Sequence, residues 1–174
     1  MEASPSPAEP GSPVSAIVAG GVSVSVSTAA TGDLPAIRSL LSEAGLPLDG
    51  ASEAFEHGVV ADADGVVVGA DGVVVGAAAI ERYGSDGLLR SVVVSPPLRG
   101  TGVGRALVVA AEALARGLGI RDLYLLTETA SEWFPRLGYA ALDRAAAPDG
   151  IAGSWEFRFA CVERGVLMHR TLPG

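Results

Sequence analysis

The sequence contains no lysine and few aromatic residues. All twelve basic residues are arginine, aromatic residues make up 5% of the 174 residues, and the net charge is −8. An acidic chain without lysine argues against nucleic-acid binding, because such binding needs a basic footprint that releases counterions. We therefore expect no nucleic-acid partner, and an anionic ligand would need a local group of arginines and backbone N–H groups.

The single cysteine, Cys161, excludes an internal disulfide and gives no sign of an oxidising compartment. No apolar run reaches the roughly 20 residues that span a bilayer, so we expect no membrane partner. Residues 1–20 are rich in Pro, Ser, Ala and Gly and lack the basic stretch of a secretory signal. We interpret them as a disordered tail, place one domain at 21–174, and expect a cytoplasmic location.

Hydrophobic periodicity predicts a mixed α+β domain. With 49% hydrophobic residues, the chain can bury a core. Alternating or continuous apolar runs predict strands, and apolar residues spaced by three or four predict helices. The strands are expected at 21–28, 73–83, 88–95, 122–127, 138–144 and 165–172, and the helices between Asp33 and Gly45 and at 51–56, 103–116 and 130–137. Their order indicates a sheet flanked by helices.

An internal repeat interrupts this pattern. The heptapeptide DGVVVGA stands at 64–70 and again at 71–77. Two copies of seven residues are too few and too short for a solenoid, so we interpret them as a tandem duplication within a β-hairpin, with turns at the Asp-Gly pairs. Because seven is odd, a direct insertion would turn every later side chain to the other face, and we expect an added turn or short strand instead.

The segment RSVVVSPPLRGTGVGRAL (90–107) leads from a buried strand through a glycine-rich loop into a helix. Such a loop suits an anion, because glycine permits close approach and the first helical N–H groups have no partner within the helix. A P-loop requires lysine and is excluded. A dinucleotide-binding fold is disfavoured by the G-x-G-x-G spacing and by the 46 residues that follow Glu128, too few to complete a doubly wound sheet. A plain tight turn would leave Arg99 unexplained.

The pattern R-x-x-G-x-G, formed by Arg99, Gly102 and Gly104, resembles the acetyl-CoA pyrophosphate motif of the GCN5-related N-acetyltransferase (GNAT) superfamily. Together with the preceding strand and the later LYLLT and WFPRLGY segments, the resemblance extends from about residue 22 to 172. It implies the GNAT fold, an α+β fold whose central mixed, mostly antiparallel sheet is flanked by helices and has a V-shaped splay between its two central strands.

A narrower resemblance is to acetyltransferases associated with arsenic-resistance gene clusters. It is carried by LLRSVVV, LYLLTETASEWFPRLGY, DRAAAPDGI, the EF pair at 156–157 and Cys161. The chain departs from that group at Val162, where the group usually has proline. Relatives of the group act on amino-acid-like arsenical or phosphinic antibiotics.

The resemblance implies acetyl-CoA as co-substrate, without a metal, and direct acetyl transfer to a primary amine in a ternary complex. Backbone groups of Val92, Val93 and Val94 would hold the pantetheine arm and the thioester carbonyl. The glycine loop and its arginines would hold the pyrophosphate; the residues implied are Arg99, Gly100, Thr101, Gly102, Val103, Gly104 and Arg105.

Acetyl transfer needs an amine that loses its proton, and it benefits from an acid that protonates the departing thiolate. The candidate bases are Glu81, where the superfamily often has a carboxylate, and Glu128, at the end of a predicted strand; either could also be an ordinary structural carboxylate. Phe134 stands where many relatives have a tyrosine acid. The proton would then come from Thr129, Ser131 or solvent, or the thiolate would leave unassisted.

Arg90 lies within an otherwise apolar strand, where an unpaired charge is costly to bury. Two alternatives stay open: an ion pair with a carboxylate such as Glu128 or Glu156, or a bidentate contact with a substrate carboxylate or oxyanion. Thr127 and Thr129, at the end of the next strand, are further candidates for substrate binding.

These observations predict an N-acetyltransferase that acts on a small amine, with an amino-acid-like toxin as the leading substrate. The alternatives are an acetyltransferase for a protein or another metabolite, and an acyl-CoA-binding sensor or accessory module without turnover. A homodimer is compatible with the sequence.

Overall fold

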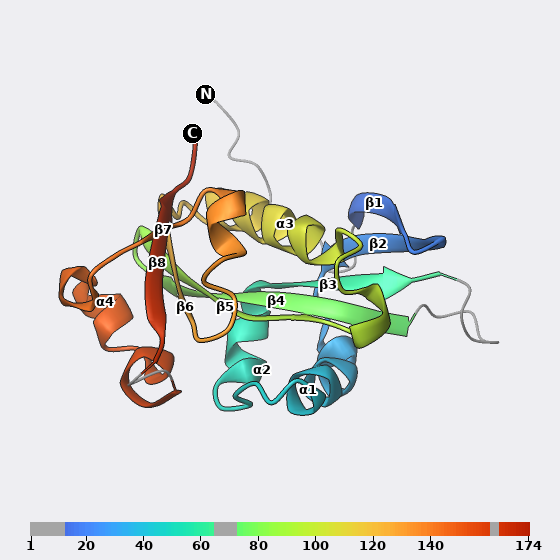
Figure 1. The fold of residues 1–174 in the computed structure, drawn as a ribbon, viewed down its shortest axis with the longest axis horizontal. Coiled ribbons are helices and arrows are strands. Elements are labelled where there is room, and N and C mark those ends of the chain that lie inside the picture. Colours follow the sequence, from blue (N-terminus) through green and yellow to red (C-terminus); the bar gives the residue numbers. More distant parts are fainter. Residues whose placement is uncertain (1–12, 65–72, 161–163) are drawn as a thin grey trace, which may run out of the picture.

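The computed structural model describes residues 13–64, 73–160 and 164–174, which form an eight-stranded sheet with helices on both faces (Figure 1). The strand order is β1-β2-β3-β4-β5-β6-β8-β7; β5 and β6 are parallel, and the other neighbours are antiparallel. The strands are β1 (Pro13–Ala19), β2 (Val22–Thr28), β3 (Gly58–Ala63), β4 (Val73–Tyr83), β5 (Asp86–Val94), β6 (Asp122–Thr127), β7 (Ala140–Ala141) and β8 (Val166–Thr171). The predicted mixed, mostly antiparallel α+β fold is confirmed.

The helices divide between the two faces of the sheet. Helix α3 (Val103–Gly117) covers one face, and α1 (Leu34–Glu43) and α2 (Ala51–Ala54) cover the other (Figure 1). Side chains of β4 alternate accordingly: Ala78 and Ile80 pack in the core beneath α3, whereas Ala77 and Ala79 pack with α1. The short α4 (Asp149–Ala152) lies beside the β8 end. None of the described helices is long and apolar enough to cross a membrane.

Two strands were not expected from the sequence. Residues 13–19, assigned to the tail from their composition, form β1, so the tail boundary at residue 20 is wrong. Gly20 and Gly21 have φ values of 58° and 83°, which suit a tight hairpin turn between β1 and β2. Strand β3 also lacked a prediction, because GVVADA is a short apolar run without clear alternation.

Several predicted elements are shorter than expected or begin differently. Asp33 precedes α1, but its carboxylate accepts a hydrogen bond from the Ala30 N–H (2.7 Å) in a preceding 3-10 turn and caps no N–H of the helix. The segment expected to form a helix at 130–137 has only a 3-10 turn at Phe134–Leu137. The strand expected at 138–144 is reduced to the two residues of β7.

The repeat lies in the connection between β3 and β4, which pair antiparallel as a hairpin requires. Residues 73–77 of the second copy belong to β4. The expected turns and the absorption of the extra copy concern 65–72, outside the described residues.

The central strands β5 and β6 diverge soon after they meet. They pair only at Asp86–Asp122, Gly87–Leu123 and Leu88–Tyr124, although both strands continue to Val94 and Thr127. This confirms the predicted V-shaped splay.

A bulge in β5 accompanies the divergence. Two steps along β4, from Ala77 to Ala79, correspond to three steps along β5, from Val93 to Arg90. Ser91, inside the bulge, has φ 55° and is the one non-glycine residue with positive φ among those described. Bulges bend a strand and redirect its side chains, so the sheet opens where functional groups are expected.

Gly76 sets how closely α3 approaches β4. A Cβ there would lie 2.8 Å from Leu107 Cδ1 and 2.9 Å from the Val93 carbonyl oxygen. We predict that Gly76→Ala lowers the free energy of unfolding by about 1–3 kcal/mol, the usual cost of overpacking a core. Gly117→Ala is the matched control: a Cβ there meets nothing within 4 Å, and alanine favours a helix by up to about 1 kcal/mol. Chemical denaturation measures both, and equal stability of the two variants would contradict the prediction.

Candidate functional site

A cavity of about 790 Å³ opens where β5 and β6 separate, a size typical of small-molecule sites. Its lining comes from both faces of the sheet. Ala44–Pro47, which follow α1, line one side, and the loop before α3 with the start of that helix lines the other. The lining includes the candidates Arg90, Val92, Val94, Arg99, Gly100, Gly102, Gly104, Arg105, Thr127, Glu128 and Thr129, and also Glu156.

The glycine loop has the backbone geometry of an anion site. Gly100 (φ 75°) and Gly102 (φ 99°) adopt left-handed conformations, and Gly102 is the N-cap of α3. Among the described residues, the N–H groups of Gly102, Val103, Gly104 and Arg105 donate no hydrogen bond. Four unpaired donors at the positive end of a 15-residue helix can bind a phosphate group.

Arg99 connects this loop to the end of β5. Its Nε donates to the Val94 carbonyl oxygen at 3.0 Å, and the side chain is otherwise exposed to solvent. Gly104 allows close packing, because a Cβ there would lie 3.4 Å from the ring of Trp133, which also lines the cavity. Arg99 is therefore placed to add charge beside the four free N–H groups.

Three of the predicted cofactor residues do not line the cavity with their side chains. Val93 packs in the core beneath α1, and Val103, the first residue of α3, is fully buried between that helix and the sheet. The Thr101 hydroxyl donates to the Leu98 carbonyl oxygen at 2.5 Å. These three side chains are therefore not placed to contact acetyl-CoA, and contacts through their backbone groups remain a prediction.

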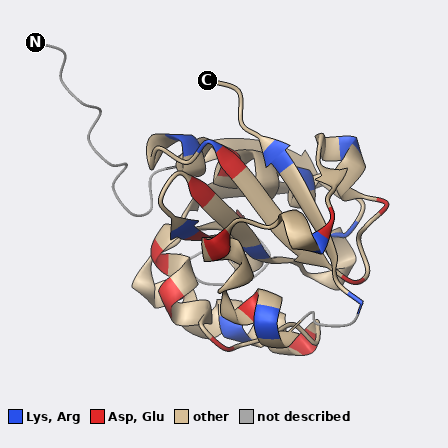
Figure 2. Ribbon diagram, turned by 90° about the vertical axis from the view of Figure 1, so that its left-hand side faces the viewer, with Lys and Arg blue, Asp and Glu red and all other residues tan. Residues whose placement is uncertain are grey.

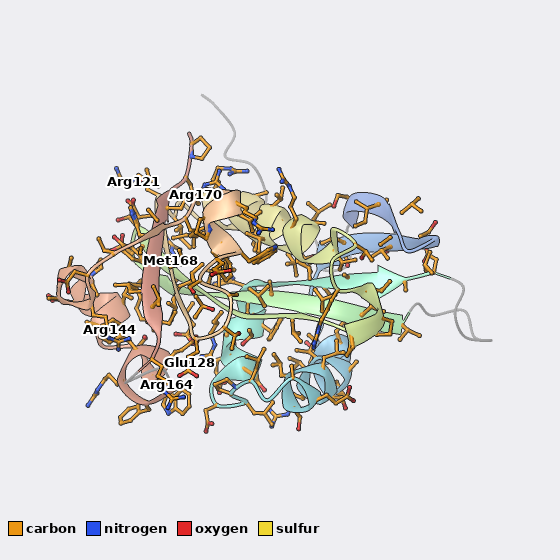
Figure 3. All side chains as sticks on the ribbon, in the orientation of Figure 1. Arg121, Glu128, Arg144, Arg164, Met168 and Arg170 are labelled. Carbon is orange, nitrogen blue, oxygen red and sulfur yellow. The ribbon has the colours of Figure 1, made fainter. Side chains whose placement is uncertain are left out.

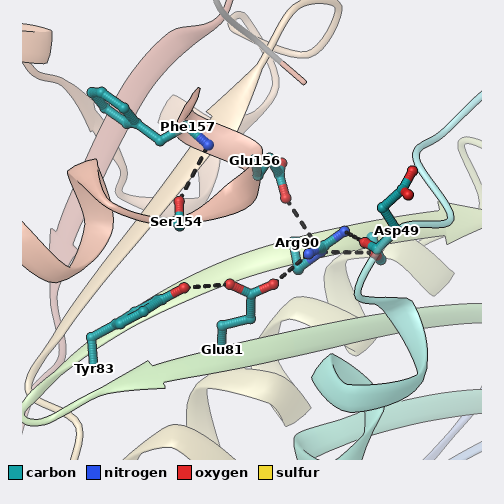
Figure 4. Close-up of polar contacts among 8 residues, drawn as sticks. Asp49, Glu81, Tyr83, Arg90, Ser154, Glu156 and Phe157 are labelled. Atoms are coloured by element: carbon teal, nitrogen blue, oxygen red, sulfur yellow. Dashed lines mark hydrogen bonds and ion pairs between the residues drawn. The ribbon is translucent and has the colours of Figure 1, made fainter. Parts of the chain in front are cut away.

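Arg90 lies in a buried cluster with two glutamates (Figure 4). It is 3% exposed; Nη1 pairs with Glu81 Oε1, Nε lies 3.3 Å from Glu156 Oε2, and Nη2 donates to the Asp49 carbonyl oxygen at 2.8 Å. The Tyr83 hydroxyl donates to the other Glu81 oxygen at 2.6 Å. Of the ion pairs expected for Arg90, the one with Glu156 is present and the one with Glu128 is not.

These contacts limit the roles that Glu81 and Arg90 can take at the site. Glu81 has both oxygens engaged and does not line the cavity, so it is poorly placed to contact an acceptor directly. Arg90 lines the cavity, but its guanidinium already serves two carboxylates. A substrate carboxylate would have to compete with both glutamates.

Glu156 is the carboxylate of the cluster that lines the cavity. Burial raises the pKa of its carboxyl to about 7; Glu81 adds to the rise, and Arg90 opposes it. From the sequence, Glu156 was predicted only as a possible ion-pair partner of Arg90, and its place in the cavity lining was missed. Its position between two aromatic residues, Trp155 and Phe157, was the one sequence feature that indicated burial.

The residues after β6 form the other wall. Thr127 is buried, and its hydroxyl accepts a hydrogen bond from the Ala130 N–H at 3.0 Å, which shapes the turn. Glu128, labelled in Figure 3, and Thr129 are exposed at the rim of the cavity. Thr127 thus has a structural task, and its contact with a substrate stays a prediction.

The position of the expected tyrosine acid is occupied by a core residue. Phe134 is 5% exposed and packs edge-on against Trp133 and Tyr139. The Tyr139 hydroxyl donates to Glu112 Oε1 at 3.0 Å, and burial raises the pKa of this phenol. The described lining therefore contains no phenol that could protonate a leaving group.

Charges of both signs are distributed over the molecule. In the ribbon view of Figure 2, arginine positions and Asp or Glu positions are both spread over the described elements. The charged groups relevant to ligand binding are therefore the ones that line the cavity.

Both the sequence and the fold are similar to those of known proteins. The family model described as an acetyltransferase (GNAT) domain matches residues 56–141. Mouse N-alpha-acetyltransferase 80 is 46% identical over 52 residues, which are 30% of this chain and 17% of that protein. The chain thus spans about one sixth of the length of this curated relative.

Two solved structures are similar over most of the chain. N-acetylglutamate synthase from Neisseria gonorrhoeae, complexed with coenzyme A and N-acetyl-glutamate, has a TM-score of 0.71 and 23% identity, and the match covers 87% of this chain and 35% of that one. Rv2747 from Mycobacterium tuberculosis, in complex with CoA and NLQ, has a TM-score of 0.70 and 24% identity over 85% of this chain and 99% of that one. At these sequence identities, the structural similarity shows that this chain shares the fold of the two proteins.

The raised pKa of Glu156 predicts a pH-dependent stability. Between its ordinary value of 4.5 and about 7, the folded protein holds a proton that the unfolded chain releases. The free energy of unfolding must therefore fall as pH rises through this window. We predict that Glu156→Gln removes most of this fall and makes the variant more stable than wild type above neutral pH. Chemical denaturation across the window measures this, and parallel curves for both proteins would contradict it.

Proposed function

Because the acetyltransferase (GNAT) domain model matches residues 56–141, we propose that the chain belongs to the GNAT superfamily and is an acetyl-CoA-dependent N-acetyltransferase. The observation that carries the proposal is the cavity in the splay between β5 and β6, which meets the four unpaired N–H groups at the start of α3. Solved structures of the same fold contain coenzyme A. The match to the curated relative is local, so activity and substrate both belong to this proposal.

Acetyl-CoA would bind from the side of α3. The N–H groups from Gly100 to Gly104 would surround the pyrophosphate, and Arg99 and Arg105 would add positive charge. The backbone of Val92, Val93 and Val94 would hold the pantetheine arm, because β5 has no partner strand on its β6 side beyond Leu88. The thioester would then lie in the gap between the strands.

The acceptor would approach from the opposite face. The cavity continues there past Arg90 and Glu156 to the residues Ala44–Pro47. A volume of about 790 Å³ that also has to hold the pantetheine arm leaves room for a small molecule. We take the acceptor to be a small, amino-acid-like primary amine, with arsenical and phosphinic amino acids as leading candidates from the narrower resemblance.

A second candidate is an acyl-CoA-binding sensor without turnover. It is favoured by the buried Phe134, which leaves the described lining without a phenol as acid. Coenzyme A thiolate is a tolerable leaving group near neutral pH, however, so catalysis does not require that acid. An acetyltransferase for protein N-termini is a third candidate, suggested by the local match to an N-alpha-acetyltransferase.

We predict that the purified protein releases free thiol from acetyl-CoA above background when a suitable amine is present. The panel would contain common amino acids, arsenical and phosphinic amino acids, and short peptides with free N-termini. Thiol release with amino acids only would support the small-acceptor proposal, and release with peptides only would support the third candidate. Acetyl-CoA binding in calorimetry without thiol release would support the sensor, and an absence of binding would contradict all three.

Arg99→Ala should weaken acetyl-CoA binding about tenfold, because one charge-assisted contact to phosphate contributes about 1.4 kcal/mol. The matched control is Arg121→Ala. Arg121 is also exposed but precedes β6, at the strand end opposite to the cavity (Figure 3). Isothermal titration calorimetry at one ionic strength compares the dissociation constants. Equal weakening in both variants would show a general charge effect instead of a site at Arg99.

A further inference from the structure

Glu156 is a buried carboxylate for which the cofactor site provides no role. It begins the π-helical turn Glu156–Ala160, is 7% exposed, and lines the cavity. Turns of this type are rare and occur frequently at functional sites. The turn holds the carboxylate beside Arg90 of β5, a residue 66 positions earlier in the chain (Figure 4).

The cluster around Glu156 carries one more negative than positive charge when both of its glutamates are ionised. Arg90 of β5 is the one cation that faces Glu156 among the described residues, and Glu81 shares it. The remaining titratable group is Tyr83 of β4, whose hydroxyl donates to Glu81. Two carboxylates on one guanidinium leave a negative charge that suits an ammonium group.

Glu156 and the glycine loop lie on opposite sides of the gap. Along β5, Leu89 packs in the core beneath α3, whereas Arg90 turns to the other face and donates to the Asp49 carbonyl oxygen between α1 and α2. Glu156 meets Arg90 on this second face. The carboxylate therefore faces the side that we assign to the acceptor, with the thioester gap beside it.

We propose that Glu156 is the catalytic base that accepts a proton from the ammonium group of the acceptor. The inference rests on the proposed function and identifies the proton acceptor of that reaction. Glu81 and Arg90 are positioning residues: Arg90 orients Glu156, and Glu81, held by Tyr83, orients Arg90.

The proposed step balances in atoms and charge. The ammonium gives one proton to Glu156, and the nitrogen lone pair forms the C–N bond to the thioester carbonyl carbon. When the tetrahedral intermediate collapses, the C–S bond breaks and the sulfur leaves as thiolate. The second proton lost by the nitrogen neutralises the thiolate, and Glu156 returns its own proton to solvent.

The protonation equilibrium of Glu156 agrees with this role. Its pKa of about 7 leaves the carboxylate substantially ionised at neutral pH and basic enough to take a proton. Glu81 contributes to the raised pKa. Removing the Glu81 charge should therefore lower the pKa of Glu156, which couples the two residues in a measurable way.

The test is the pH dependence of kcat/KM for acetyl transfer to the best amine of the panel. For wild type we expect an acid limb with an apparent pKa near 7. Glu156→Gln should lower kcat/KM on the order of 100-fold near neutral pH and remove this limb, with an unchanged Kd for acetyl-CoA. Glu81→Gln should shift the limb to lower pH. Glu132→Gln, an exposed residue outside the cavity lining, should reproduce the wild-type profile.

The other outcomes separate a failure of the inference about Glu156 from a failure of the proposed function. If Glu156→Gln is folded and active with an unchanged acid limb, Glu156 has a structural role and the inference fails while the proposed function stands. If Glu156→Gln does not fold, a Glu81→Gln profile identical to that of wild type overturns the inference by itself. If wild type transfers acetyl to no amine, the proposed function fails, and the base fails with it.

Discussion

The early divergence of β5 and β6 is the constraint on which the rest of the molecule depends. After three paired residues, each strand continues without the other, and backbone groups that a sheet normally pairs are left facing a gap. The bulge at Ser91, with its positive φ, bends β5 at this point. Both the cavity and its access from two faces follow from this interruption.

The gap is also where the molecule places its least typical core residue. A guanidinium that is 3% exposed needs anionic partners, and it obtains two, one from the neighbouring β4 and one from the C-terminal region. The ion pairs thus join distant segments of the chain across the open part of the sheet. Burial, with a smaller contribution from the Glu81 charge, raises the pKa of Glu156, and the second carboxylate gives this side of the cavity an excess of negative charge.

Local signals predicted most of the fold, and they failed where a partner elsewhere decides the outcome. Strand β5 and helix α3 were expected almost to the residue, because a continuous apolar run and a regular apolar stripe are properties of the segment itself. Strand β1 was missed because its composition resembles a tail and its stability comes from pairing with β2. The segment 130–137 has helical composition, but a turn capped by Thr127 and the packing of Phe134 limit it to a short 3-10 turn.

The sequence by itself determined the glycine-rich loop between β5 and α3, since glycine spacing, the preceding strand and the following helix are all local. It also determined that Arg90 needs a carboxylate, because burying a lone charge is costly. Only the tertiary structure decided which carboxylates those are. The sequence left Glu128 and Glu156 open as partners, whereas in the fold Arg90 pairs with Glu81 of β4 and with Glu156, which lies in a turn 66 residues beyond Arg90 that folds back over β5. The physical reason is that ion pairing and burial depend on distance in space, which spacing along the chain does not reveal.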